Sequence, residues 1–96
     1  MYRVLLVDDE PIALDSLEYM LRKNRKDIEV VGKARSGRDA VEKAYNARPD
    51  IVLMDINMPG INGLEAIRRI KDTNSSAQCI ITTAFDYFDY AVEAME

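Results

Sequence analysis

The alternation of short aliphatic runs with helically spaced apolar residues constrains this fold more than any other feature. Four runs rich in β-branched and aliphatic residues predict buried strands at residues 3–7, 29–34, 50–54 and 78–83. Each run is followed by apolar residues at the three- and four-residue spacing of a helix. Strands and helices in direct alternation predict an α/β fold, in which a parallel sheet carries helices on both faces.

The four helices are predicted from their apolar faces and from the residues at their ends. Asn62, three residues before Glu65, has the spacing of an N-cap, whereas Ser36-Gly37 is typical of a turn and Arg48-Pro49 of a helix end. The residues expected on the apolar faces are Ala13, Leu17, Met20 and Leu21 in the first helix, Ala40, Val41, Ala44 and Tyr45 in the second, Leu64, Ile67 and Ile70 in the third, and Phe88, Ala91, Val92 and Met95 in the fourth.

The composition excludes several classes of protein. The 96 residues are 48% hydrophobic and 31% charged, which is typical of one globular domain. A net charge of −4 argues against nucleic-acid binding by this segment, and no apolar stretch approaches the ~20 residues of a transmembrane helix. The absence of histidine excludes Ser-His-Asp catalysis, and the single cysteine, Cys79, excludes an intramolecular disulfide. We therefore expect a cytoplasmic setting and chemistry that depends on carboxylates.

Polar side chains stand where the predicted strands end. Asp8 and Asp9 follow the first strand, Asp55 follows the third, and Thr83 ends the fourth. Because ligands of an open parallel sheet bind at the carboxyl ends of its strands, these residues form a candidate site if their strands are neighbours. Three aspartates in one pocket repel one another unless a cation is present, and Mg²⁺ takes oxygen ligands of this kind.

Each of these residues also has an ordinary structural explanation. Asp8 and Asp9 could form a turn with an N-cap, and Asp55 could be a solvated loop residue. Thr83 alone would be an ordinary β-branched strand residue. Their joint occurrence at strand ends favours a functional site.

Three motifs carry a resemblance to a known family: VLLVDDE at 4–10, DIVLMDINMPG at 50–60 and IITTA at 80–84. On these motifs, residues 2–96 resemble the receiver domain of bacterial two-component response regulators. The resemblance implies a flavodoxin-like sheet in the order 2-1-3-4-5. It also implies an aspartyl-phosphate switch, with the phosphohistidine of a sensor histidine kinase as the phosphoryl donor.

The resemblance assigns a role to individual residues. Asp55 is the expected phospho-acceptor, and Thr83 is the expected switch hydroxyl. Mg²⁺ is expected to bind Asp9, Asp55 and the backbone carbonyl of Asn57, with Asp8 acting mainly through metal-bound water.

The chain departs from the family pattern at its C-terminal side. Residues 1–96 are expected to form an incomplete receiver domain with four of five strand-helix units, because the fifth strand and helix, with a phosphoryl-binding Lys, have no counterpart in the sequence. About 24 further residues would supply that unit. Residues 85–90 are similar to receivers fused to AraC-type DNA-binding domains, so a transcription regulator is the expected output, and a homodimer stays open.

Two other functions share part of this chemistry. A Mg²⁺-dependent aspartyl-phosphate phosphohydrolase would place its nucleophile after the first strand with a second Asp two residues later, but Asp8 is followed by Asp9 and Glu10. A non-phosphorylated interaction module would not need the full set of strand-end residues. Both alternatives are disfavoured.

Overall fold

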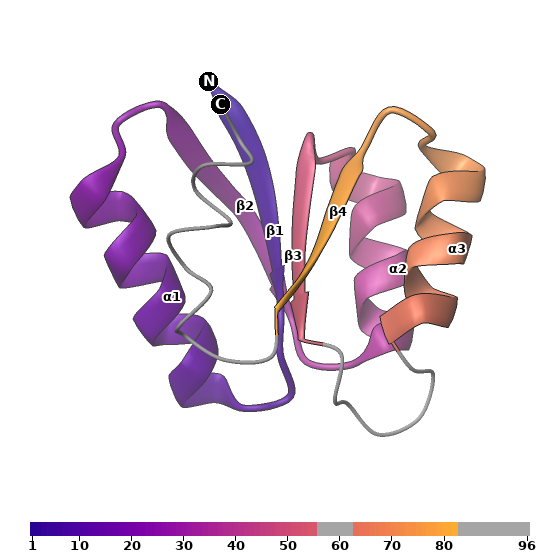
Figure 1. Cartoon of the computed structure of the whole chain (residues 1–96), viewed down its shortest axis with the longest axis horizontal. Coiled ribbons are helices and arrows are strands. Elements are labelled where there is room, and N and C mark those ends of the chain that lie inside the picture. Colours follow the sequence, from indigo (N-terminus) through magenta and orange to yellow (C-terminus); the bar gives the residue numbers. More distant parts are fainter. Residues whose placement is uncertain (56–62, 83–96) are drawn as a thin grey trace.

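A parallel four-stranded sheet forms the centre of the computed structural model, which describes residues 1–55 and 63–82. Its strands are β1 (Tyr2–Val7), β2 (Ile28–Ala34), β3 (Ile51–Asp55) and β4 (Gln78–Thr82), in the order β2-β1-β3-β4. Helix α1 (Pro11–Asn24) covers one face, and α2 (Gly37–Ala47) and α3 (Gly63–Thr73) cover the other (Figure 1). The predicted α/β class, the flavodoxin-like arrangement and the order 2-1-3-4 are confirmed.

The central strands are buried on both faces, as their unbroken aliphatic sequences predict. The apolar core is divided by the sheet into two layers. On the α1 side lie Val4, Leu6, Leu14, Leu21, Ile28, Ile51 and Leu53, and on the α2 and α3 side lie Leu5, Val7, Ala34, Ala40, Ala44, Val52, Met54, Ala66, Ile70 and Ala77. Each fully buried Leu, Ile or Val contributes roughly 1.5–3 kcal/mol through removal from water. This burial fixes β1 and β3 side by side.

The register aligns the strand ends at one edge of the sheet. Val7, the last residue of β1, lies opposite both Ala34 of β2 and Met54 of β3. Asp55 ends β3 opposite Thr82 of β4. The residues that directly follow β1 are therefore brought next to the end of β3.

The helix ends have identifiable local causes. Pro11 occupies the start of α1, where its missing N–H removes no helical hydrogen bond. Ser36, expected in a turn, is instead the N-cap of α2, and its Oγ accepts a hydrogen bond from the backbone N–H of Asp39 at 3.1 Å. Helix α1 continues through the polar residues Arg22 and Lys23 and ends at Asn24.

Two residues predicted on inner helix faces are exposed. Leu64 is 60% exposed, because Gly63, Ala66 and Ile70 form the buried stripe of α3 and Leu64 lies about 100° around the helix from Gly63. Tyr45 is 58% exposed because it lies about 100° around α2 from the buried Ala44. The predicted loop at 56–60, the Asn62 cap, Thr83 and the fourth helix lie outside the described residues. In the part described, no helix is long and apolar enough to cross a membrane.

Candidate functional site

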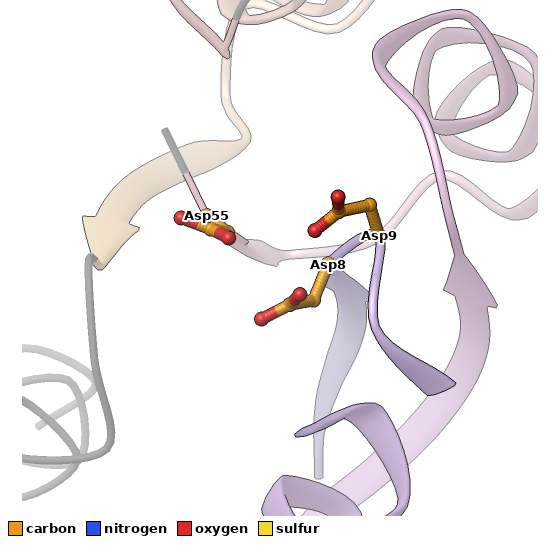
Figure 2. A group of neighbouring side chains, drawn as sticks. All are labelled: Asp8, Asp9 and Asp55. Carbon is orange, nitrogen blue, oxygen red and sulfur yellow. The ribbon is translucent and has the colours of Figure 1, made fainter. Parts of the chain in front are cut away.

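Three aspartates meet at the carboxyl edge of the sheet. Asp8 and Asp9 come from the connection after β1, and Asp55 is the last residue of β3 (Figure 2). Each offers a carboxylate oxygen, and these oxygens all lie within 4.8 Å of one another. All three residues are partly exposed, so the group is open to solvent and to a ligand.

Backbone hydrogen bonds hold Asp8 in place. Its N–H donates to the carbonyl of Ala34 at 3.0 Å, which extends the pairing of β1 with β2 by one residue. Its Oδ1 accepts a hydrogen bond from the N–H of Glu10 at 3.0 Å. This short turn reverses the chain into α1 at Pro11, so Asp9 is held between two fixed neighbours.

The electrostatics of the group oppose three full negative charges. Partial burial raises the pKa of the Asp8 carboxyl, and the negative charges of Asp55 and Asp9 raise it further. The hydrogen bond from Glu10 acts in the opposite direction but does not cancel these effects on the Asp8 pKa. A bound cation would relieve the repulsion.

The donor set fits a hard divalent cation. Carboxylate oxygens are the ligands that Mg²⁺ and Ca²⁺ prefer, and Mg²⁺ keeps several waters that complete its octahedral shell. The three carboxylates, which are all partly exposed, could supply some of these ligands and solvent the others. The acidic pocket could therefore hold a metal ion.

The structure brings together three of the five predicted site residues, Asp8, Asp9 and Asp55. Asn57 and Thr83 lie outside the described residues, and the roles of all five stay predictions. The Ala34 carbonyl and the Glu10 N–H, which orient Asp8, were not anticipated. No sequence signal identifies them, because both are backbone groups whose positions follow from strand register.

The chain belongs to the response regulator receiver domain family, whose sequence model matches residues 4–96. It is 40% identical over 96 residues to YesN of Bacillus subtilis, an uncharacterized transcriptional regulatory protein, covering 100% of this chain and 26% of YesN. It is 38% identical over 96 residues to the sensory transduction protein LytT of Bacillus cereus, covering 100% of this chain and 38% of LytT.

A solved receiver domain has the same architecture. The REC domain of AraT, a response regulator from Geobacillus stearothermophilus, matches with a TM-score of 0.78 and 32% identity, over 98% of this chain and 73% of that one. The chain spans between about a quarter and two fifths of the length of YesN and LytT. The acidic group thus lies in a regulatory receiver domain of a two-component response regulator.

Proposed function

We propose that this receiver domain accepts a phosphoryl group on Asp55 from the phosphohistidine of a sensor histidine kinase. The convergence of Asp55 with Asp8 and Asp9, whose carboxylate oxygens lie within 4.8 Å of one another, is the observation that carries the proposal. Asp55 also occupies the phospho-acceptor position of the family motif at residues 50–60.

In the proposed reaction, one carboxylate oxygen of Asp55 attacks the phosphorus atom of the phosphohistidine. A P–O bond forms as the P–N bond breaks, and the electron pair of the broken bond stays on the imidazole nitrogen of the kinase. The product is an acyl phosphate, and its later attack by water releases inorganic phosphate and restores the carboxylate. The domain would thereby promote both its own phosphorylation and its own dephosphorylation.

The acidic group supports Mg²⁺ as the cofactor. Asp9 and Asp55 would hold the ion directly, together with the backbone carbonyl of Asn57, and Asp8 would act mainly through a bound water. When bound, Mg²⁺ would neutralise negative charge on the phosphoryl oxygens. The role of Asn57 rests on the family motif.

The switch and the output follow from the same family resemblance. The hydroxyl of Thr83 would hydrogen-bond the phosphoryl group and favour a conformation that is less populated without it. We infer that the longer protein is a cytoplasmic transcription regulator, since YesN is named as a transcriptional regulatory protein. An AraC-type DNA-binding output is suggested by residues 85–90, and phosphorylation could act through a homodimer.

We also infer that residues 1–96 supply four of the five strand-helix units of the receiver domain. The chain covers 73% of the AraT receiver structure. In the described sheet β4 lies at an edge, where a fifth strand could pair. A further unit of about 24 residues would complete the domain.

The phosphorylation proposal is tested with the full-length protein, Mg²⁺ and acetyl phosphate as a small donor. Intact-protein mass spectrometry should detect one added phosphoryl group per chain, and chelation of Mg²⁺ should prevent it. The variant Asp55→Asn should gain none. Equal labelling of the variant and the wild type would contradict the assignment of Asp55.

The same samples separate the alternative functions. A phosphohydrolase would release phosphate from an added phosphomonoester over many turnovers, whereas a receiver would carry at most one phosphoryl group per chain at a time and leave the phosphomonoester intact. A folded protein that binds Mg²⁺ but never becomes labelled would support a non-phosphorylated interaction module.

A further inference from the structure

We propose that Lys33 is a positioning residue for the acidic site, because it fixes α1 against the strand that anchors Asp8. The inference rests on the Mg²⁺ site proposed above. Asp8 and Asp9 lie in a connection of only three residues, 8–10, between the end of β1 and Pro11. The position of Asp9 therefore depends on how α1 lies against the sheet.

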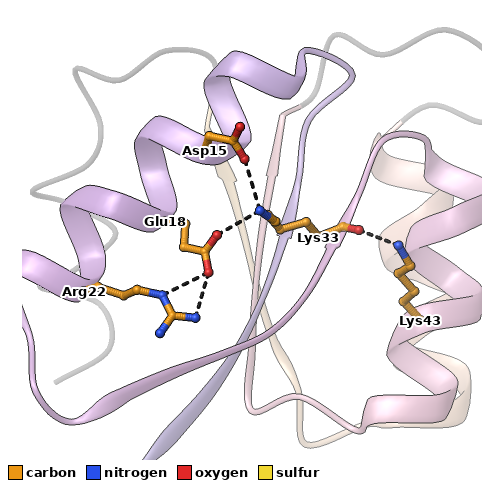
Figure 3. A network of polar contacts seen from close by, with 5 residues as sticks. All are labelled: Asp15, Glu18, Arg22, Lys33 and Lys43. Carbon is orange, nitrogen blue, oxygen red and sulfur yellow. Dashed lines mark hydrogen bonds and ion pairs between the residues drawn. The ribbon is translucent and has the colours of Figure 1, made fainter.

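Neighbouring residues of β2 contact the start of this connection and the helix that follows it. At one end, the N–H of Asp8 donates to the carbonyl of Ala34 at 3.0 Å. On α1, beyond the connection, Nζ of Lys33 donates to Oδ1 of Asp15 at 3.1 Å and lies 2.9 Å from Oε1 of Glu18 (Figure 3). A shift of α1 relative to β2 would break these contacts and displace the connection.

A β-bulge turns Lys33 toward α1. Strands β1 and β2 are in register up to Val30 and again from Gly32, so Val31 is an extra residue on β2. One extra residue reverses the alternation of side-chain faces, and Lys33 consequently lies opposite Leu6. Leu6 packs in the core layer on the α1 side. Without the bulge, Lys33 would face α2.

The Lys33 contact to Glu18 is the better sheltered of the two. The Glu18 side chain is 20% exposed, compared with 73% for Asp15, so solvent weakens its ion pair less. Arg22 orients the other carboxylate oxygen of Glu18, with Nε at 2.9 Å and Nη2 at 2.7 Å. Lys33 and Arg22 together lower the pKa of the Glu18 carboxyl, which keeps it an anionic acceptor.

Lys33 is also held from the opposite face of the sheet. Its backbone carbonyl accepts a hydrogen bond from Nζ of Lys43 on α2 at 2.5 Å (Figure 3). The start of α1 has no side-chain cap, since Glu10 at its N-cap position makes no side-chain capping bond. Lys33 therefore connects α1, β2 and α2 and adds polar contacts to a helix that has no side-chain N-cap.

The test compares Mg²⁺ binding by the wild type, Lys33→Met and Lys33→Arg. Binding is monitored through the amide chemical shifts of residues 8–10. Lys33→Met should weaken Mg²⁺ binding ~3- to 10-fold, at or below the lower end of the loss typical for residues that orient metal ligands. Lys33→Arg keeps a donor for both carboxylates and should stay within about twofold of the wild type. Faster hydrogen exchange of the Leu14 amide, which donates to the Glu10 carbonyl at 3.2 Å, should accompany the loss in Lys33→Met.

A matched control separates positioning from charge. Lys23→Met removes the same charge from an exposed lysine of α1 that lies over the Tyr19 ring. Removal of a positive charge should by itself leave Mg²⁺ binding unchanged or slightly tighter. Loss of positioning should instead make Mg²⁺ binding weaker, so the two effects have opposite directions. Binding by folded Lys33→Met that equals or exceeds that of Lys23→Met would overturn the proposal.

A second variant keeps the test decisive if Lys33→Met does not fold. The first pair, Asp15→Asn combined with Glu18→Gln, breaks the same contacts from the α1 side. The second pair, Glu29→Gln combined with Glu42→Gln, is its control, because it removes the same amount of negative charge at exposed residues elsewhere. Weaker Mg²⁺ binding by the first pair than by the second would support positioning, and equal binding would refute it. If wild type and Asp55→Asn bind Mg²⁺ equally, the proposed metal site itself fails, which is a separate outcome.

Discussion

At the residue scale, Asp8 carries a charge that the folded protein disfavours. Burial and the neighbouring aspartates raise the pKa of Asp8, so its proton is bound more tightly in the folded state than in the unfolded chain. The resulting penalty is fully present only above the folded pKa of Asp8. It is relieved as pH falls through the folded pKa toward the ordinary value of 3.8.

Asp8→Asn should therefore stabilise the Mg²⁺-free protein at pH 7. The amide oxygen can still accept the Glu10 hydrogen bond, while the repulsive charge is gone. We expect the melting temperature to rise by about 4–8 °C, the shift that roughly 1 kcal/mol produces in a domain of this size. The advantage should shrink as pH is lowered toward 4, and Asp72→Asn on α3 is the charge-matched control. An advantage that is the same at every pH would show that charge is not its cause.

Asp9 and Asp8 should differ in their importance for metal binding. As a direct ligand, Asp9 should matter more than a carboxylate that acts through water. We expect Asp9→Ala to raise the Mg²⁺ Kd by about 100-fold or more and Asp8→Ala by about 10-fold. Mg²⁺ titrations of both variants measure this, and the reverse order would exchange the roles of the two residues.

At the scale of elements, Arg48 joins the ends of two helices. Its backbone adopts the left-handed conformation, with φ 50° and ψ 59°, just after α2. For a residue other than glycine this conformation costs roughly 1–2 kcal/mol. The side chain compensates, because its Nη1 donates to the carbonyl of Thr73 at the end of α3 and its guanidinium lies 5.4 Å from the Tyr45 ring centre.

Substitutions at Arg48 should separate these two effects. Arg48→Ala loses the side-chain contacts and keeps the backbone cost, so we expect a destabilisation of about 1–2 kcal/mol. Arg48→Gly loses the same contacts but removes the backbone cost, and it should be about 1 kcal/mol more stable than Arg48→Ala. Urea denaturation gives both values. An alanine variant more stable than the glycine variant would contradict the role of the left-handed backbone.

Sequence patterns predicted the sheet better than they predicted side-chain placement. The strands and the parallel sheet follow from alternation, whereas the strand order, and with it the meeting of Asp8 with Asp55, came from the resemblance to receiver domains. The exposure of Leu64 was missed because an apolar residue beside a buried stripe satisfies the same periodicity. The bulge at Val31 was also missed, since a one-residue register shift has no reliable sequence signature, and with it the contact of Lys33 with α1.

At the scale of the whole molecule, the acidic site lies where the direction of chain winding changes. The chain leaves β1 toward α1 on one face, whereas α3, which follows β3, covers the other face (Figure 1). Ligand sites of open α/β sheets occur at such points. A change in charge at this edge is therefore in a position to affect elements of both helical layers. We propose that Asp55 is the residue that receives that charge.

The most direct test of this claim is to locate the phosphoryl group by chemical mapping. The full-length protein is phosphorylated with acetyl phosphate and Mg²⁺ and then treated with borohydride, which reduces an acyl phosphate on aspartate to homoserine. Fragmentation mass spectrometry of the peptide that spans β3 should find homoserine at position 55 in the phosphorylated sample and aspartate in the untreated control. Homoserine at position 8 or 9 instead, or a phosphorylated protein with unreduced Asp55, would contradict the account.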